Sequence, residues 1–342
     1  MIRRFISIIA ASALLAPAAA SADNEGEVNL YSARQESLIL PLLEQFEEQT
    51  GIEVNLVTGS ADALIERLEV EGRNTPADVL LTTDAGRLHR ATEAGLLQGV
   101  DSDVLDERVP SHLRHPEGRW FGLSKRARVI SYNRDAVDPS ELPTYEALTD
   151  AKWEGEVCIR SSSNIYNQSL LASMIAEHGE EGATEWAEGV VNNMARRPQG
   201  GDTDQIRAVA SGVCDVAVNN TYYYGRLVNS DDAEDRAVAE KVGLIFPNQD
   251  GRGTHVNVSG AGVTTHASNV DTATQLLEFL VSDEAQQWYA QVNYEYPVNP
   301  EAEVAESVEG WGYPFEEDDL PLARLGELNA EAVRIFDRAG WR

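Results

Sequence analysis

Cysteine is scarce in this sequence: 342 residues contain only Cys158 and Cys214. The two lack the paired C-x-x-C spacing of a zinc site, and neither has a neighbouring histidine in the sequence that would activate a thiol nucleophile. In an oxidising compartment an isolated pair of cysteines most simply forms one disulfide. Because both lie in predicted strands of the same half of the chain, we expect them to be joined.

Positively charged residues are also few. The chain has 27 lysines and arginines against 57 aspartates and glutamates, which gives a formal net charge of −30 at pH 7. Such a surface repels the phosphates of nucleic acids, so we expect no nucleic-acid partner. A well-solvated acidic surface is the simplest interpretation, and a surface that concentrates cations is the alternative.

Long apolar runs are missing except at the N-terminus. There, Arg3 and Arg4 precede an apolar stretch and Ala20-Ser21-Ala22 follows it, which is the pattern of a secretory signal and its cleavage site. We predict that residues 1–22 are a cleavable signal peptide and that the mature protein is periplasmic. No later stretch approaches the ~18 apolar residues that a membrane-spanning helix requires.

Enzyme signatures are missing as well. The sequence has no G-x-S-x-G, H-E-x-x-H, Walker or G-x-G-x-x-G motif, and its six histidines are scattered. Only His112 and His115 lie close together, in a stretch typical of an exposed loop. We therefore expect a protein that is not an enzyme. An exported hydrolase or lyase is the alternative, although the sequence assembles no nucleophile and base.

What the mature chain does contain is an alternation of predicted strands and helices. The first run has strand patterns at 28–33, 52–59 and 77–83, and each is followed by a helical pattern, at 36–51, 61–72 and 84–95. The second run has strand patterns at 154–160, 212–220, 243–249 and 260–267, and helical patterns at 162–179, 184–195, 270–291 and 328–340. This order predicts an α/β fold with two lobes that close around a ligand.

Short crossovers, rather than a flexible tether, are expected to join the two lobes. Lobe 1 is predicted to contain residues 23–129 plus about 254–300. Lobe 2 is predicted to contain about 130–253 plus 301–342.

Three consecutive tyrosines, Tyr222 to Tyr224, follow the predicted strand 212–220. Neighbouring side chains point to opposite faces of a strand and fan out around a helix, so three phenols cannot all enter the core. In α/β lobes, ligand groups come from the loops after the carboxyl ends of strands. Further candidates at or near strand ends are Tyr132, Tyr31, Arg34, Gln35 and Glu36.

Six stretches carry a resemblance to a known family: NLYSARQE, TPADVLLTTDAGRL, KRARVISYNRD, RSSSNIYNQSLLASMI, GGDTDQIRAVASGVCDVAVNNTYYYGRL and GTHVNVSGAGV. Together they closely resemble the periplasmic ferric-iron-binding proteins that supply ATP-binding-cassette (ABC) transporters, and the likeness extends along nearly all of the mature chain. It implies a two-lobed periplasmic-binding-protein fold of the class II type, with a ligand cleft between the lobes. It also implies Fe(III) as the ligand, an inner-membrane ABC permease as the partner, and a monomeric protein.

Carried over position by position, the resemblance places the tyrosine pair of the family on Tyr222 and Tyr223. The earlier lone tyrosine of the family falls on Tyr132. Arg226 matches an arginine that lies behind the pair. Tyr224 has no role in the family pattern, and we expect it to pack in the core.

The sequence departs from the family pattern after its first strand. Many relatives have a histidine there, sometimes followed by a tyrosine, where this chain has Gln35 and Glu36. Either of these residues, or Tyr31, is a candidate to complete the coordination; the alternative is a synergistic anion such as carbonate or bicarbonate. Arg34 and Arg126 are the candidates to hold that anion through charge-assisted hydrogen bonds.

The chemistry of these residues agrees with Fe(III) as the ligand. Ferric iron is a small, hard cation that prefers anionic oxygen donors to sulfur. A phenol has a pKa near ~10 and is neutral at pH 7, but a coordinated metal holds it deprotonated. Three phenolates neutralise a +3 ion, and two adjacent tyrosines at a turn can both reach it. The alternative ligands are a polyamine, which would favour a more acidic cleft, or an oxyanion.

Overall fold

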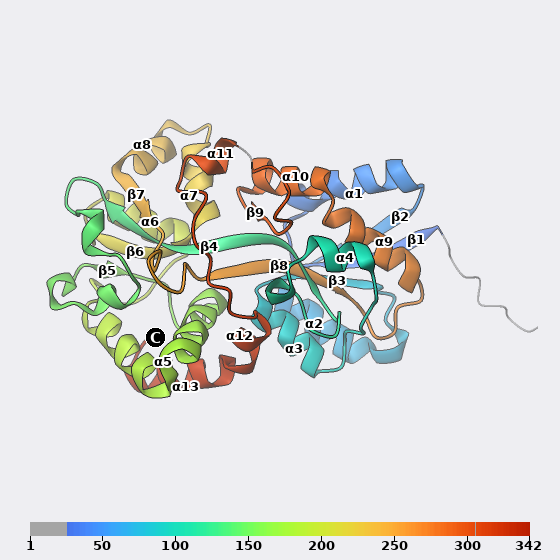
Figure 1. Ribbon diagram of the computed structural model, residues 1–342, viewed down its shortest axis with the longest axis horizontal. Helices are drawn as coiled ribbons and strands as arrows, with labels where there is room; N and C mark the ends of the chain where they lie inside the picture. The colour runs from blue at the N-terminus through green and yellow to red at the C-terminus, as the bar shows by residue number, and fades with distance from the viewer. Residues whose placement is uncertain (1–25, 305) are drawn as a thin grey trace, which may run out of the picture.

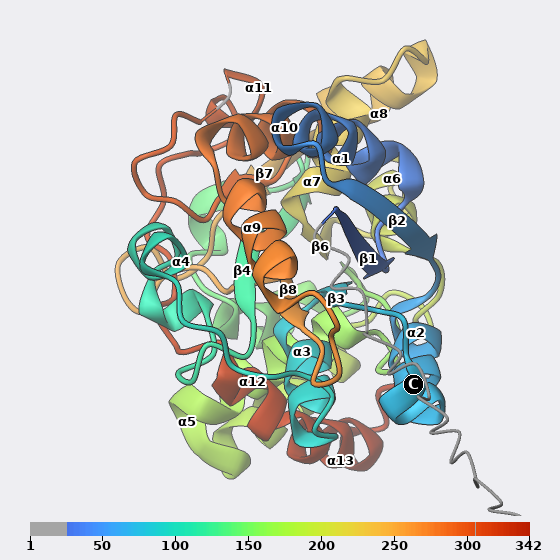
Figure 2. The ribbon, with the colours of Figure 1, turned by 90° about the vertical axis from the view of Figure 1, so that its right-hand side faces the viewer.

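The computed structural model describes residues 26–304 and 306–342, so the predicted signal peptide lies outside the described residues. Two α/β halves lie side by side along the longest axis of the molecule (Figure 1). Helices cover the strands on both sides, with α1 and α10 on one side and α3, α12 and α13 on the other (Figure 2). The predicted fold class is therefore confirmed.

The first half contains the three parallel strands that the sequence predicts. They are β1 (Glu27–Ser32), β2 (Glu53–Thr58) and β3 (Val79–Thr83), in the order β2-β1-β3. The helices of this half are α1 (Glu36–Thr50), α2 (Ala61–Glu71), α3 (Ala85–Glu93) and α4 (Asp103–Arg108). Each of the first three helices buries one apolar stripe against the sheet, as an amphipathic helix should; in α1 the stripe is Ile39, Leu42, Leu43 and Phe46.

The second half is built around a parallel pair of strands, β5 (Val157–Cys158) and β6 (Val216–Asn220). Its other elements are α5 (Ile165–Asn192), α6 (Asp202–Ala210), α7 (Thr221–Val228), α8 (Ala233–Lys241) and β7 (Val242–Ile245). The helix break predicted at Gly179 is present within α5, where this glycine has a φ of 69°. The sequence did not predict α6, α7 or α8.

Two long strands run from one half into the other (Figure 1). They are β4 (Phe121–Asn133) and β8 (Val256–Val263). Residues 121–127 of β4 pair with β8, and residues 128–133 pair with β6 and β7. The predicted strand at 260–267 starts too late, because β8 begins at Val256 with buried polar residues, Asn257 and Ser259, that hide its strand pattern.

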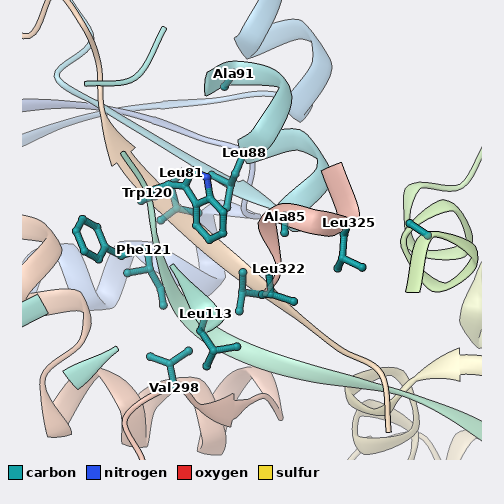
Figure 3. Packing of buried hydrophobic residues seen from close by; sticks show 14 of the residues in the cluster. Leu81, Ala85, Leu88, Ala91, Leu113, Trp120, Phe121, Val298, Leu322 and Leu325 are labelled. Carbon is teal, nitrogen blue, oxygen red and sulfur yellow. The ribbon is translucent and has the colours of Figure 1, made fainter. Parts of the chain in front are cut away.

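The C-terminal part of the chain packs against both halves. It contains α9 (Val270–Leu280), α10 (Asp283–Asn293), β9 (Tyr296–Pro297), α11 (Glu306–Glu309), α12 (Ala323–Glu327) and α13 (Asn329–Ala339). The first two form the predicted helical hairpin. Leu322 and Leu325 join the buried cluster that contains Leu88, Trp120 and Phe121 (Figure 3). None of the helices in the described residues is long and apolar enough to span a membrane.

Cys158 and Cys214 form the predicted disulfide, which joins β5 to the loop before β6. Their Cα atoms lie 5.9 Å apart, and 56 positions separate them in the sequence. Both residues are buried in a small apolar cluster that also contains Tyr224 and Leu227. The bond therefore ties β5 to the segment that leads into β6, and the tyrosine-bearing helix α7 follows β6 directly.

Reduction of this disulfide is expected to lower the free energy of unfolding by about 2–4 kcal/mol, because the bond removes loop entropy from the unfolded chain. Guanidinium unfolding of the oxidised and reduced protein measures the difference. Thiol titration of the unfolded, unreduced protein should find no free thiol. Two free thiols would contradict the pairing.

Candidate metal centre

The tyrosine run lies in the first turn of α7, directly after β6, and not in an irregular turn as expected from the sequence. Successive helical residues are rotated by about 100°, so the three phenols separate. Tyr222 and Tyr223 stay together, with ring centroids 4.2 Å apart. Tyr224 packs in the core as expected: its hydroxyl donates to the Val242 carbonyl oxygen at 3.4 Å, and its ring meets that of Trp311 edge-on.

A tyrosine that the sequence reasoning missed completes the cluster. Tyr166 is the second residue of α5, and the Tyr222 hydroxyl donates to the Tyr166 hydroxyl oxygen at 3.3 Å. A signal for it was available, because Tyr166 follows β5 as Tyr222 follows β6, and the carboxyl ends of these parallel strands share one sheet edge. The phenols of Tyr166, Tyr222 and Tyr223 thus converge where two helices begin.

Tyr132 does not lie in this cluster. The expectation that it lies beside Tyr222 and Tyr223 is therefore corrected. β4 runs antiparallel to β6, with Arg128 opposite Asn220 next to the pair and Tyr132 opposite Val216 at the other end of β6. Four residues of strand, about 13 Å, separate the two positions. The Tyr132 ring instead covers Gly243, where an added Cβ would lie 2.3 Å from the ring.

Tyr31 is also engaged elsewhere, contrary to its expected place in the cleft. It is 1% exposed, and its hydroxyl lies 3.0 Å from each carboxylate oxygen of Glu71 in α2. The Arg67 guanidinium lies 4.6 Å from the centroid of its ring. Burial and the hydrogen bond to Glu71 raise the pKa of Tyr31. This tyrosine therefore links β1 to α2 and does not face the three phenols.

Gln35 and Glu36 are exposed where α1 begins. Within the described residues, neither makes a hydrogen bond to Tyr166, Tyr222 or Tyr223. The structure therefore adds neither of them to the phenol cluster.

Arg34 lies in a buried ion-pair cluster. Its Nη2 donates to the Glu295 carboxylate and, at 2.9 Å each, to the hydroxyl oxygens of Ser124 and Ser259. Burial acts to raise the pKa of Glu295, but the charges of Arg34 and Arg126 outweigh burial and lower it, so the carboxyl stays ionised. Arg34 is thus already paired with an anion that the protein supplies.

Arg126 lies between this cluster and the phenols. Its Nη2 donates to Ser259 and lies 3.4 Å from Glu295, and its guanidinium carbon lies 5.7 Å from the centroid of the Tyr222 ring. The residue is only 2% exposed, yet its Nε and Nη1 have no hydrogen-bond partner among the described residues. Buried guanidinium donors without a partner can bind an anion in a charge-assisted manner.

Three more guanidiniums surround the phenols. Arg226 is exposed and lies over both rings of the pair, 5.1 and 5.7 Å from their centroids, which is where the resemblance placed it. Arg128 and Arg160 each lie 5.9 Å from the centroid of the Tyr166 ring. Positive charge at this distance favours the ionised form of a phenol.

Burial opposes ionisation of the pair. It is the main cause that raises the pKa of Tyr222 well above its usual value, and negative charge on Tyr166 or Tyr223 raises it further. Burial likewise raises the pKa of Tyr223. The nearby arginines and the N-termini of α5 and α7 act in the opposite direction. A strongly charged cation is therefore needed to ionise the phenols at neutral pH.

The donor set is unusual because it consists of phenols. Within the described residues, no group of three or more histidine, cysteine, aspartate or glutamate side chains could hold a metal ion. Of the three phenols, Tyr166 lines a small recess, together with Asp84, Arg126, Arg128, Asn220, His255 and Asn257. Oxygen donors of this kind suit a hard trivalent cation better than zinc or copper.

Two α/β halves joined by long strands, with three phenols gathered at neighbouring strand ends, have the architecture of a solute-binding protein of the periplasmic type. The chain belongs to the bacterial extracellular solute-binding protein family, whose model matches residues 74–315. This is a family of transport proteins and not a class of enzymes.

Individual relatives cover almost the whole chain. It is 52% identical over 327 residues to iron uptake protein A1 of Synechocystis sp., covering 96% of this chain and 91% of that protein. It is 25% identical over 338 residues to the Fe(3+)-binding periplasmic protein of Serratia marcescens, covering 98% and 96% of the two chains. A solved Trichodesmium structure, described as a complex with iron and citrate ligands, has a TM-score of 0.90 and 52% identity, covering 93% of this chain and 100% of that one.

Proposed function

We propose that this chain is the extracytoplasmic Fe(III)-binding component of an ABC-type iron uptake system. Iron is the cargo, held by the phenolates of Tyr166, Tyr222 and Tyr223. The observation that carries the proposal is the convergence of the three phenols, with the hydroxyl oxygens of Tyr166 and Tyr222 only 3.3 Å apart. Relatives named for iron uptake and for Fe(3+) binding support it.

Charge balance explains why three phenols suit this cargo. Each phenol gives up its proton to coordinate the metal, and three phenolates cancel the charge of Fe(III). An octahedral ion then has positions left for oxygen atoms from another source. Within the described residues neither Gln35 nor Glu36 forms a hydrogen bond to the phenols, which favours an exogenous ligand for those positions.

We infer that this exogenous ligand is an anion. Four guanidiniums surround the phenols, those of Arg126, Arg128, Arg160 and Arg226, against three nearby carboxyl groups, those of Asp84, Asp202 and Glu295. Such surroundings repel a bare cation and attract an anionic ferric complex. Carbonate, bicarbonate or citrate, the last named with iron in the Trichodesmium structure, would supply oxygen ligands. Arg126, with its free donors, is better placed than Arg34 to hold this anion.

The positive surroundings also argue against the polyamine alternative. A polyamine is a cation, and its recognition requires carboxylates that face the ligand. The guanidiniums of Arg126, Arg128, Arg160 and Arg226 each lie within 6 Å of the centroid of a phenol ring.

The iron is proposed to lie where lobe 2 meets lobe 1. The lobe boundaries are kept as residues 23–129 plus about 254–300, and about 130–253 plus 301–342. Two features support them: β4 changes partner from β8 to β6 between Ala127 and Arg128, and α13 packs on α5.

The place of action proposed for the mature chain is the periplasm. The N-terminal sequence pattern and the Fe(3+)-binding periplasmic relative support this location. As a monomer loaded with iron, the protein would deliver its cargo to an inner-membrane ABC permease, which is the general role of solute-binding proteins in uptake.

Protein loaded with ferric citrate is expected to be coloured, because ferric phenolate centres absorb visible light, and to bleach when a strong chelator removes the iron. The Tyr222→Phe/Tyr223→Phe double variant keeps both rings but loses two anionic donors. It should stay colourless and elute from gel filtration without iron. The visible spectrum and the iron content of the protein peak are the measurements.

The loading result and two further measurements separate the claims. A wild-type protein that retains no iron and shows no visible band overturns the proposed function, and calorimetric binding of spermidine would then favour the polyamine alternative. Loading from ferric nitrilotriacetate in buffer with bicarbonate, with citrate or with neither tests the anion. Equal affinity in all three buffers rejects bicarbonate and citrate as the anion and leaves iron binding intact.

A further inference from the structure

A buried carboxylate behind the phenols connects the elements that carry them. Asp202 is the first residue of α6 and has no exposed surface. Its Oδ2 accepts from the backbone N–H of Asn220 at 3.0 Å, and Asn220 is the residue from which α7 begins. The carboxylate therefore fixes the junction of strand and helix that places Tyr222 and Tyr223.

The same carboxylate is linked through Arg128 to Asn167, the residue next to the third phenol. Arg128 Nη1 donates to Asp202 Oδ2 at 3.0 Å, and its Nη2 donates at 2.6 Å to Oδ1 of Asn167, the neighbour of Tyr166. The Asn167 amide donates at 2.8 Å to the Arg160 carbonyl oxygen. The Arg160 guanidinium closes the circuit with a contact of 3.5 Å to Asp202 Oδ1.

Three of the four side chains in this hydrogen-bonded circuit are buried, and only that of Arg160 is partly exposed. Arg128 is 2% exposed, Asn167 is 1% exposed and Asp202 is fully buried. In such surroundings hydrogen bonds are electrostatically strong, and the loss of one partner leaves the others unpaired at high cost. Four elements are thereby held in one arrangement: β4 and the starts of α5, α6 and α7.

We propose that Asp202 is a positioning residue that sets the spacing of the three phenols before iron arrives. The inference rests on the proposed function, because it concerns the geometry of the Fe(III) site. Asp202 acts through Asn220 and Arg128 and not by coordination. With the phenols already in place, the metal has only to displace their protons, which is how residues behind metal ligands generally raise affinity.

If Asp202 acted only through its charge, its removal would change the iron affinity in the opposite direction. Burial is the main cause of the raised pKa of Tyr222 and Tyr223, and the negative charge of Asp202 adds to it. Removing that charge alone would favour the phenolates and tighten iron binding. Removing the positioning role weakens iron binding, so the direction of the change distinguishes the two.

Asp202→Asn removes the charge and keeps nearly the same shape. Its Fe(III) affinity, measured by chelator competition from ferric citrate, is expected to fall by about 10–100-fold, the range typical of residues behind metal ligands. The visible band should lose intensity and shift, because fewer phenolates reach the metal. Asp202→Glu keeps the charge but displaces the carboxylate, and it should show the same loss, which a purely electrostatic role would not produce.

Asp78→Asn is the matched control. Asp78 is equally buried and accepts from the backbone N–H groups of Asn29, Ser268 and Asn269, but these contacts lie in the half of the molecule that contains β1 and β3. This variant is expected to lower the melting temperature without changing the iron affinity or the visible band. The control therefore shows whether loss of stability alone reduces iron binding.

The outcomes decide between the claims. If Asp202→Asn binds iron with unchanged or higher affinity and an unchanged band, the positioning role is overturned while iron binding by the wild-type protein stands. If the wild-type protein binds no iron, it is the proposed function that fails. Should Asp202→Asn not fold, Asp202→Glu decides, and wild-type affinity together with a wild-type spectrum in a folded Asp202→Glu protein rejects the inference.

Discussion

Tyr166→Phe is expected to abolish most Fe(III) binding and the visible colour, and Tyr132→Phe is expected to change neither. Phenylalanine keeps the ring and its packing but deletes the donor oxygen, so the +3 ion loses one of three anionic ligands. Because Tyr166 is proposed to coordinate directly, the loss of affinity should exceed the about 10–100-fold typical of residues behind the ligands. The Tyr132 hydroxyl lies against Gly243, four strand residues from the level of the pair.

The two variants make a matched pair, since each deletes one hydroxyl from a half-buried tyrosine. Both tyrosines lie in the half of the molecule that contains β5 and β6. Chelator competition and the intensity of the visible band are the measurements, with circular dichroism to show that both variants are folded. The opposite result, with Tyr132→Phe colourless and Tyr166→Phe unchanged, would restore the assignment that the sequence alone suggested. Loss of binding in neither variant would reject both tyrosines as ligands.

The alternation of strands and helices in the first half could be predicted because local patterns carry it. In α1 the residues Ile39, Leu42, Leu43 and Phe46 recur at helical spacing and are all buried. Ser60 caps α2 by accepting from the Ala63 N–H. Such signals depend only on neighbours within one or two turns.

The helix α7, which the sequence did not predict, and the start of β8, which it placed too late, contain buried residues that are not purely apolar. The α7 helix has only eight residues and begins with tyrosines, of which two face the proposed iron site. In β8, Asn257 and Ser259 are buried because they accept and donate hydrogen bonds within the protein. A buried polar residue satisfied by a distant partner gives no hydrophobic pattern to read.

The site illustrates the same limit. Position by position, the resemblance gave Tyr222, Tyr223 and the place of Arg226, but it assigned the lone tyrosine to Tyr132. Which end of β4 adjoins the pair depends on the antiparallel register with β6, and that register is a non-local property. The pairing of Arg34 with Glu295 is non-local as well, because 261 positions separate the two residues.

Acidification is expected to release the iron steeply, at pH values at which the protein is still folded. Burial raises the pKa of Tyr222 and Tyr223, so in the iron-free protein both phenols hold their protons at neutral and acid pH. Binding of Fe(III) expels these protons, and the iron-free form therefore binds more protons than the loaded form. By linkage, the affinity falls as the pH falls, without a plateau in this range.

The number of phenolates sets the steepness of this release. Each proton displaced by the metal contributes about a tenfold change in affinity per pH unit, so three phenolates give a fall of up to about 1,000-fold per unit. The arginines around the phenols keep their charge throughout and do not add to the slope. A bound carbonate, bicarbonate or citrate takes up protons in acid and makes the release steeper.

Chelator competition at a series of pH values, from about pH 8 to about pH 5, measures the slope, with the chelator's own protonation accounted for and folding followed by circular dichroism. Measurements with and without bicarbonate separate the anion from the phenolates, and Arg126→Ala should remove only the part that depends on bicarbonate. A slope of about one decade per pH unit would indicate that only one phenolate coordinates the iron. An affinity that stays flat between neutral and mildly acid pH would contradict coordination by tyrosinates altogether, whatever the anion does.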